Sequence, residues 1–326
     1  MPQSPQNCPY MVFISEQIIY YLCSRYSQEN YDLEPKPRWY ITAANKKMKK
    51  HLIILSTLVL FAFCSCSKFA GEPISKDFSI SSNYTKLEVE DAFDVTVSDV
   101  ATQITVTAGE RVMPNVVVET VENTLKIYLK GWHSNRGTDM TVILPYNANL
   151  TSVDLSGASE FHSEYGLEGN KVEVELSGAS DFYCDIDANE VDIDLSGASD
   201  FFGDILADEI EMDLTGSSKI KGYVEALDLD FDLSGASEAT LEGQVGTLQI
   251  DLTGASDINK TINGDRYGFA CDQCEGSVSG ASNVYIHCDG TIKVNLSGAS
   301  DLHFTGRAFT GDCTISGGSN IYHDTL

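Results

Sequence analysis

Hydrophobic and polar residues alternate strictly through the carboxyl-terminal half of the chain, between residues 151 and 326. The alternation is organised around a Ser-Gly-Ala-Ser motif and its close variants. Positions two, four and six before each motif glycine are mostly apolar, whereas positions three and five before it are mostly acidic or polar. A short apolar segment follows each motif. A period of two with one apolar face predicts half-buried β-strands, two clear ones and a third short one in each repeat.

The repeat has a nearly constant length. Its glycines are Gly157, Gly178, Gly197, Gly216, Gly235, Gly254, Gly280, Gly298 and Gly317. Most steps are 19 residues, which at ~3.3 Å per residue traces a path of roughly 60 Å, enough to close one coil of a β-helix. Because one coil cannot bury its own apolar edge, successive coils must stack. The sequence therefore predicts an all-β, parallel β-helix solenoid of about nine ~19-residue coils over residues 151–326, with leucine stacked on leucine inside.

The motif itself is interpreted as structural. Glycine suits a sharp corner pressed between its neighbours, and the paired serines can form local hydrogen bonds. Nine equivalent serines without a recurring histidine do not make nine nucleophilic sites.

The amino-terminal part divides into a leader and a cap. Residues 48–65 begin MKK and continue with an apolar run, as in a lipoprotein signal peptide, and Cys66 is the expected lipidation site, with Cys64 as the alternative. A short membrane anchor and a plain secretory signal are the other interpretations. Residues 1–47 are interpreted as a mis-annotated extension. Residues 66–77 would be a tether, and the strand-like segments of residues 78–150 an amino-terminal β-rich cap that protects the open edge of the rod.

Charge narrows the range of partners. The formal net charge of −27 argues against nucleic acid and anionic lipid as partners, and permits cations, basic proteins or neutral sugars.

Stacking should align the acidic positions into two columns on one outer face, where carboxylates ~5 Å apart repel by about 0.9 kcal/mol even in water. Bound Ca²⁺ would relieve that repulsion; the alternative is a solvated face that keeps the rod soluble. The candidate cation-binding residues are Glu173, Glu175, Asp192, Asp194, Glu211, Asp213, Asp230 and Asp232. We expect no other cofactor.

Two further features carry candidate chemistry. Cys271 and Cys274 have the C-x-x-C spacing, but no second pair follows at zinc-site spacing, so a local disulfide or plain core thiols are favoured. Every coil carries the same acids, so none is singled out as catalytic. The best breaks in the pattern are Lys219, Lys221 and the insert at 255–279. Outward-facing aromatic residues beside the motif could form a sugar-stacking stripe or half-buried shoulders.

Three segments besides the motif carry a family resemblance. They are YTKLEVEDAFDVTVSD (84–99), ENTLKIYL (122–129) and TVILPYNANLTSVDLSGASEF (141–161). Together with the repeated SGAS, the chain from about residue 78 to 326 resembles the putative autotransporter adhesin head domain, or GIN domain, of bacterial exported lipoproteins. The resemblance implies a right-handed parallel β-helix behind a β-rich lead, at the cell surface or in the periplasm of a Gram-negative bacterium. It supplies no catalytic residues.

These observations predict a non-catalytic outer-membrane lipoprotein, anchored to the membrane by its lipid, that acts as an adhesin or surface-binding module. Its partner would be a host or bacterial protein or glycan. A carbohydrate-binding or carbohydrate-active β-helix and an envelope structural or sensing protein are the alternatives.

Overall fold

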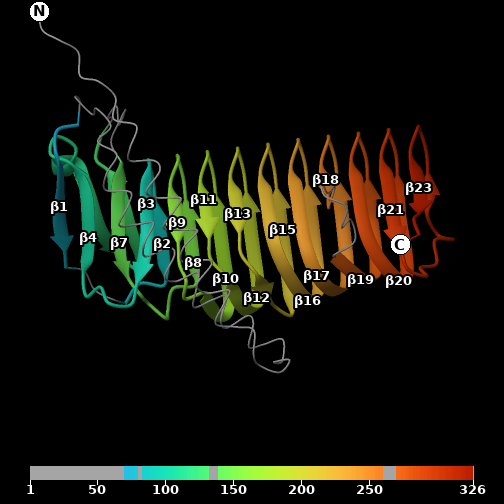
Figure 1. The fold of residues 1–326 in the computed structure, drawn as a ribbon, viewed down its shortest axis with the longest axis horizontal. Helices are drawn as coiled ribbons and strands as arrows, with labels where there is room; N and C mark the ends of the chain where they lie inside the picture. Colours follow the sequence, from blue (N-terminus) through green and yellow to red (C-terminus); the bar gives the residue numbers. More distant parts are fainter. Residues whose placement is uncertain (1–69, 80–82, 132–138, 260–268, 326) are drawn as a thin grey trace, which may run out of the picture. The chain divides into compact units, whose positions relative to one another are not determined.

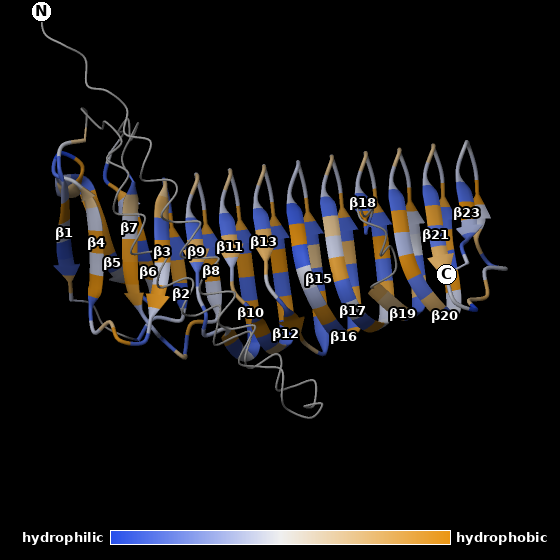
Figure 2. Cartoon of the chain, in the orientation of Figure 1, coloured by the Kyte–Doolittle hydropathy of each residue, from blue (hydrophilic) through white to orange (hydrophobic). Residues whose placement is uncertain are grey.

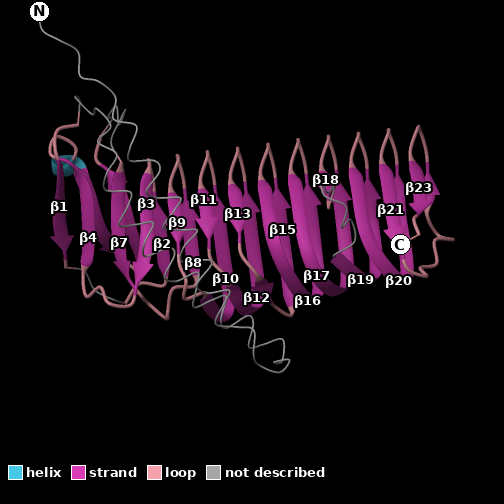
Figure 3. Ribbon diagram, in the orientation of Figure 1, coloured by secondary structure: helices cyan, strands magenta, loops and turns pink. Residues whose placement is uncertain are grey.

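The computed structural model describes residues 70–79, 83–131, 139–259 and 269–325. These residues form 23 strands of one continuous hydrogen-bonded sheet, together with a single turn of 3-10 helix. Figure 1 shows the strands side by side along the solenoid, and Figure 3 shows that the rest is loop. The elements are β1 (Pro73–Phe78), β2 (Lys86–Val89), β3 (Phe93–Ser98), β4 (Ile104–Gly109), η2 (Met113–Asn115), β5 (Val116–Val121), β6 (Thr124–Leu129), β7 (Met140–Pro145), β8 (Ser152–Leu155), β9 (Glu160–His162), β10 (Leu167–Leu176), β11 (Asp181–Tyr183), β12 (Ile186–Leu195), β13 (Asp200–Phe202), β14 (Ile205–Leu206), β15 (Glu209–Leu214), β16 (Lys219–Leu233), β17 (Glu238–Leu252), β18 (Asp257–Ile258), β19 (Phe269–Val278), β20 (Asn283–Leu296), β21 (Asp301–Thr305), β22 (Thr314–Ile315) and β23 (Asn320–His323).

Successive coils pair as parallel strands in the register set by the motif. Leu176 on β10 lies opposite Leu195 on β12, and Leu195 lies opposite Leu214 on β15. The same register continues to Leu233 and Leu252 on β16 and β17. The predicted all-β parallel solenoid of about nine coils is therefore confirmed, over residues 152–323.

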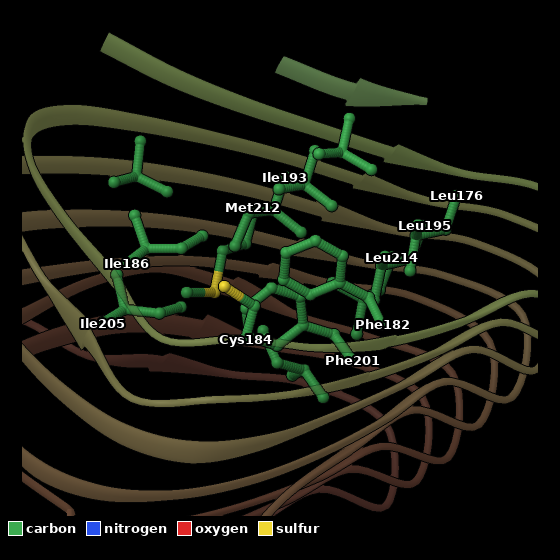
Figure 4. Packing of buried hydrophobic residues seen from close by; sticks show 14 of the residues in the cluster. Leu176, Phe182, Cys184, Ile186, Ile193, Leu195, Phe201, Ile205, Met212 and Leu214 are labelled. Carbon is green, nitrogen blue, oxygen red and sulfur yellow. The ribbon is translucent and has the colours of Figure 1, made fainter. Parts of the chain in front are cut away.

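The core lies inside the coils, where the apolar face of every strand points. The stacked leucines from Leu155 to Leu252 are at most 1% exposed. Beside them the rings of Phe161, Phe182 and Phe201 stack with centroids 5.3 and 5.0 Å apart. Figure 4 shows this packing from close by, and Figure 2 shows the alternation of hydrophobic and hydrophilic residues along the strands. Because each ring covers the ring below it, the coils exclude water from their shared interior.

The SGAS corners form the row of narrow loops along the upper edge of Figure 1. At each corner the glycine has a positive φ, +79° at Gly178, and the next N–H, that of Ala179, donates 2.8 Å to the carbonyl oxygen of Gly157 one coil earlier. The second serine is buried, and Ser180 Oγ donates 2.8 Å to the carbonyl oxygen of Ser177. The motif thus satisfies the polar groups of a buried corner with its own atoms.

The parallel ladder extends into the region predicted as a cap and then ends. β2 and β3 pair in parallel with β8 and β9, so residues 86–98 form a further coil below the first SGAS motif. Asp91 occupies the glycine position of that coil, with φ +76°, and its carbonyl oxygen accepts from Ala158 N–H. β6 and β7 stack on β2 and β3.

The order of pairing changes at the amino-terminal end. β5 pairs antiparallel with β6, β4 pairs antiparallel with β7, and β1 pairs antiparallel with β4. Residues 73–77, predicted as part of the tether, lie in β1. The antiparallel strands cover the edge that the parallel coils would leave open, and the edge strand β1 carries Pro73 and Lys76, both of which discourage pairing with another chain.

Candidate functional site: the acidic face

The acidic face consists of outward-pointing carboxylates on the sheet built from β8, β10, β12, β15, β16 and β17. The structure brings the predicted residues together in two columns. One column runs through Asp154, Glu175, Asp194, Asp213, Asp232 and Asp251, and the other through Glu173, Asp192, Glu211 and Asp230, each in register with the next. All eight predicted candidate residues belong to it. Their alignment could be predicted from the repeat length alone, because residues one repeat apart are register partners.

A groove of about 410 Å³ runs along this face. Its lining includes the column of Asp194, Asp213, Asp232 and Asp251. It also includes a column of hydroxyl groups that sequence reasoning did not select, namely Ser196, Thr215, Ser234 and Thr253. Each hydroxyl residue directly precedes a motif glycine, so its place in the repeat could be recognised in the sequence. The sequence did not show that these hydroxyls line the same groove as the carboxylates. Among the residues that the structure describes, no lysine or arginine lines the groove.

Several carboxylates on this face are harder to ionise than free ones. Burial, and then the neighbouring Asp213 and Asp230, raise the pKa of Asp232 above its ordinary value. Burial, and then the negative charge of Asp192, raise the pKa of Asp194 and of Asp213. For the more exposed Glu211 the negative charge of Asp192 is the largest cause of its raised pKa. The column therefore holds repulsion that a cation would relieve.

Lysines neutralise the acidic face near its amino-terminal margin. Lys171 Nζ lies 2.6 Å from Glu190 and 3.5 Å from Asp192, and Lys86 Nζ lies 3.7 Å from Asp154. Within the described residues, no Lys, Arg or His side chain forms an ion pair with the carboxylates that line the groove. The least compensated negative charge thus lies in the middle of the solenoid, along the groove.

The predicted Ca²⁺ site stays a prediction. In the described ranges, no group of three or more His, Cys, Asp or Glu side chains is already arranged to hold a metal ion. Carboxylate oxygens suit Ca²⁺, but the aligned acids would have to turn toward one another to provide its six to eight ligands.

The outward aromatic residues form ladders on another face of the solenoid, the aromatic face, which is built from β9, β11, β13, β20, β21 and β23. His162, Tyr183 and Phe202 stack with centroids 4.3 and 4.9 Å apart and planes within 7° of parallel. Tyr285, His303 and Tyr322 stack in the same way farther along, at 4.6 and 4.5 Å. Lys219 and Lys221 interrupt the pattern between the ladders, in register with Asp200 and Phe202. Since the rings cover one another's faces, the ladders present mainly ring edges to the outside.

The predicted cysteine pair lies on one strand of the core. Cys271 and Cys274 are free, buried thiols, both on β19. In the structure they are core thiols, one of the two predicted states, and a local disulfide between them stays a prediction. At both ends of the predicted insert at 255–279 the chain forms regular strands, β18 and β19.

The predicted extension, signal peptide, Cys64 and Cys66 lie outside the described residues. Within the described part of the chain, no helix is long and apolar enough to cross a membrane.

Comparison with known proteins agrees with this architecture. The family model described as "Putative auto-transporter adhesin, head GIN domain" matches residues 83–223 and 202–308, which is well over half of the chain. The chain belongs to this family. The resemblance to this family that the sequence motifs predicted is therefore confirmed. Membership of the family suggests a cell-surface or exported protein. Among curated proteins, none matches the sequence.

Solved structures share the fold of this GIN-domain protein. A putative adhesin from Parabacteroides distasonis has a TM-score of 0.58 at 19% identity, over 78% of this chain and 98% of its own. A putative lipid binding protein from the same organism has a TM-score of 0.52 at 18% identity, with the same coverage. A putative adhesin from Parabacteroides merdae has a TM-score of 0.53 at 16% identity, over 78% and 97%. At these identities the likeness concerns the fold alone.

Proposed function

We propose that this GIN-domain protein is a non-catalytic outer-membrane lipoprotein that uses the acidic face of its β-helix to bind a surface ligand. Family membership supports an adhesin-like role. The leader of residues 48–65, followed by Cys66, supports a lipid anchor that would hold the domain at the membrane.

The groove along the acidic face is the observation that carries the proposal. Four carboxylates and four hydroxyls line it in register. Since none of the described residues that line it is cationic, the groove favours a ligand that is positively charged or bridged by cations, and elongated along the solenoid axis. Equivalent groups recur from coil to coil, which supports extended binding better than reaction at a single bond.

Sugar stacking on the aromatic ladders is less well supported. A lectin-type contact needs an exposed ring face, and within each ladder the ring faces contact each other. Carbohydrate recognition is therefore assigned to the groove, where hydroxyl and carboxylate oxygens would accept hydrogen bonds from a basic amino sugar or a basic protein segment. An envelope structural or sensing role without an external ligand is the outcome if nothing binds.

Binding to arrays of glycans and basic peptides tests the role of the groove. Wild type should bind cationic members of the arrays, and binding should weaken as salt rises. The double variant Asp213→Asn/Asp232→Asn should lose most of that binding. Its matched control, Asp181→Asn/Asp200→Asn, removes the same charge from the aromatic face and should retain it. Equal loss in both variants, or binding of neutral ligands only, would contradict the proposal.

Metabolic labelling with an alkyne fatty acid tests the anchor separately. Cys66→Ala should abolish label and release the protein from the membrane fraction, whereas Cys64→Ala should leave both unchanged. Label that persists in Cys66→Ala would assign the anchor to another residue.

A further inference from the structure

Three buried cysteines meet at one corner of the solenoid, near its carboxyl-terminal end. Cys271 and Cys274 lie on β19 and Cys288 lies on β20, and each is at most 3% exposed. Between Cys271 and Cys274, Asp272 and Gln273 both face outward, so the strand bends there and turns the two thiols toward the inside of the same corner.

The ladder places Cys288 directly beside Cys271. The two residues are Cα partners in the parallel pairing of β19 with β20, and the register shifts immediately after them, where β20 has one more residue in the corner than β19. Neighbouring parallel strands lie about 4.8 Å apart, which is inside the ~4.4–6.8 Å range of Cα separations that disulfides span. Cys274 instead pairs with Ile292, one step beyond the irregularity.

The Cys288 thiol points into the corner that Cys271 enters. Cys288 Sγ donates 3.5 Å to the carbonyl oxygen of Asp272, the residue after Cys271, and lies 3.8 Å from the carbonyl oxygen of Thr291. The neighbouring Cys271 thiol, and then burial, raise the pKa of Cys288 well above its ordinary value. In the folded, reduced chain Cys288 is therefore a poor nucleophile, and all three thiols are closed off from solvent.

We propose that Cys271 and Cys288 form a disulfide that ties two successive coils together, and that it closes while the corner is still open during folding. A low-molecular-weight or protein disulfide is the oxidant. The Cys271 thiolate attacks one sulfur of the oxidant and expels the other as a thiol, which gives a mixed disulfide. The Cys288 thiolate then attacks the Cys271 sulfur and releases the second thiol. Two S–H bonds are lost from the chain, one S–S bond forms, and the oxidant leaves as two thiols.

Such a bond would reinforce the solenoid where its repeat is least regular. The glycine step from Gly254 to Gly280 is 26 residues, the longest in the chain, and the coil that follows it contains the register shift. This inference does not depend on the proposed binding role of the acidic face.

Refolding the full chain with oxidised glutathione, followed by alkylation under denaturing conditions and peptide mapping, tests the assignment. Cleavage before aspartate and after glutamate separates the three cysteines into three peptides, because Asp272 lies between the first two and Glu275 between the last two. The expected product is the Cys271 peptide joined to the Cys288 peptide, two hydrogen masses lighter than the pair, with Cys274 alkylated.

Single variants separate this bond from its competitors. Cys274→Ala should keep the cross-link, Cys288→Ala should abolish it, and Cys184→Ala, a buried thiol on a distant coil, should keep it. Reduction should lower the thermal midpoint of the wild type but leave that of Cys288→Ala unchanged. A Cys271–Cys274 or Cys274–Cys288 product, or three alkylated thiols after oxidative refolding, would overturn the proposal.

Discussion

Replacing a corner glycine by alanine separates two reasons why the motif requires glycine. At Gly216 φ is +78°, and an added Cβ would lie 2.5 Å from the carbonyl oxygen of Gly197 and 3.1 Å from its nitrogen. At Gly166 φ is +74°, almost the same, but the nearest atom to an added Cβ is the carbonyl oxygen of Asp185 at 3.4 Å, an ordinary contact. The two sites share a backbone conformation and differ in crowding.

The magnitudes follow from this difference. Placing alanine in the left-handed region should cost about 1–2 kcal/mol at either site. At Gly216 the oxygen that would be struck also accepts the Ser217 N–H at 2.7 Å, so moving it away stretches the ladder. Overpacking against a fixed backbone adds about 1–3 kcal/mol. We therefore expect Gly216→Ala to lose roughly twice the free energy of unfolding that Gly166→Ala loses.

Urea unfolding followed by far-ultraviolet circular dichroism measures both variants against wild type. The comparison uses the midpoint together with the slope, since an unchanged slope shows that the same surface is exposed. If the two variants lose equal stability, the close approach of successive corners is not what demands glycine, and conformation alone is responsible.

Three further predictions concern charge and packing. Folding raises the pKa of Asp194, Asp213 and Asp232 above the ordinary 3.8. The folded chain therefore holds more protons than the unfolded chain above about pH 4. The free energy of unfolding should consequently fall as pH rises through the raised pKa values. Urea midpoints that rise from about pH 4 to about pH 7 at low salt would refute this. Millimolar Ca²⁺ should raise the thermal midpoint relative to chelator if it binds the folded acidic face, and equal midpoints would dismiss the calcium hypothesis. Phe182→Ala should cost about 3–5 kcal/mol because it empties the middle of a buried ring stack, whereas Tyr183→Ala on the outer ladder should cost about 0.5–1.5 kcal/mol; similar losses in urea unfolding would contradict the assigned faces.

Much of the fold could be predicted because the repeat fixes the register. Once Gly197 stacks on Gly178, 19 residues earlier, the residues between them have known partners, so the leucine core and the acidic columns follow from counting. The coil at residues 86–98 was assigned to the cap instead, since Asp91 stands where the motif has glycine. Its positive φ is not apparent from the letter, although Asp tolerates that conformation better than most residues. The antiparallel pairing of β1 with β4 likewise leaves no recognisable pattern in the local sequence.

The site was predictable in its parts but not in its shape. Alternation shows that Asp213 faces outward, but it does not show that Asp213 and Thr215 line one groove together. The cysteines show the limit of local spacing. Two thiols three residues apart are easy to recognise in the sequence, whereas the placement of Cys271 beside Cys288, 17 positions away, follows only from the pairing of β19 with β20.

The strict 19-residue step from Gly178 to Gly254 makes the middle of this molecule modular in length. Duplicating or deleting one whole unit there would leave each remaining side chain with an equivalent neighbour, and both terminal segments unaltered. Tandem duplication can thus adjust how far the far end projects, in increments of about 4.8 Å, without any compensating substitution. Inside the strand that precedes a motif glycine, by contrast, inserting or deleting a single residue would turn the inward-facing residues before it outward.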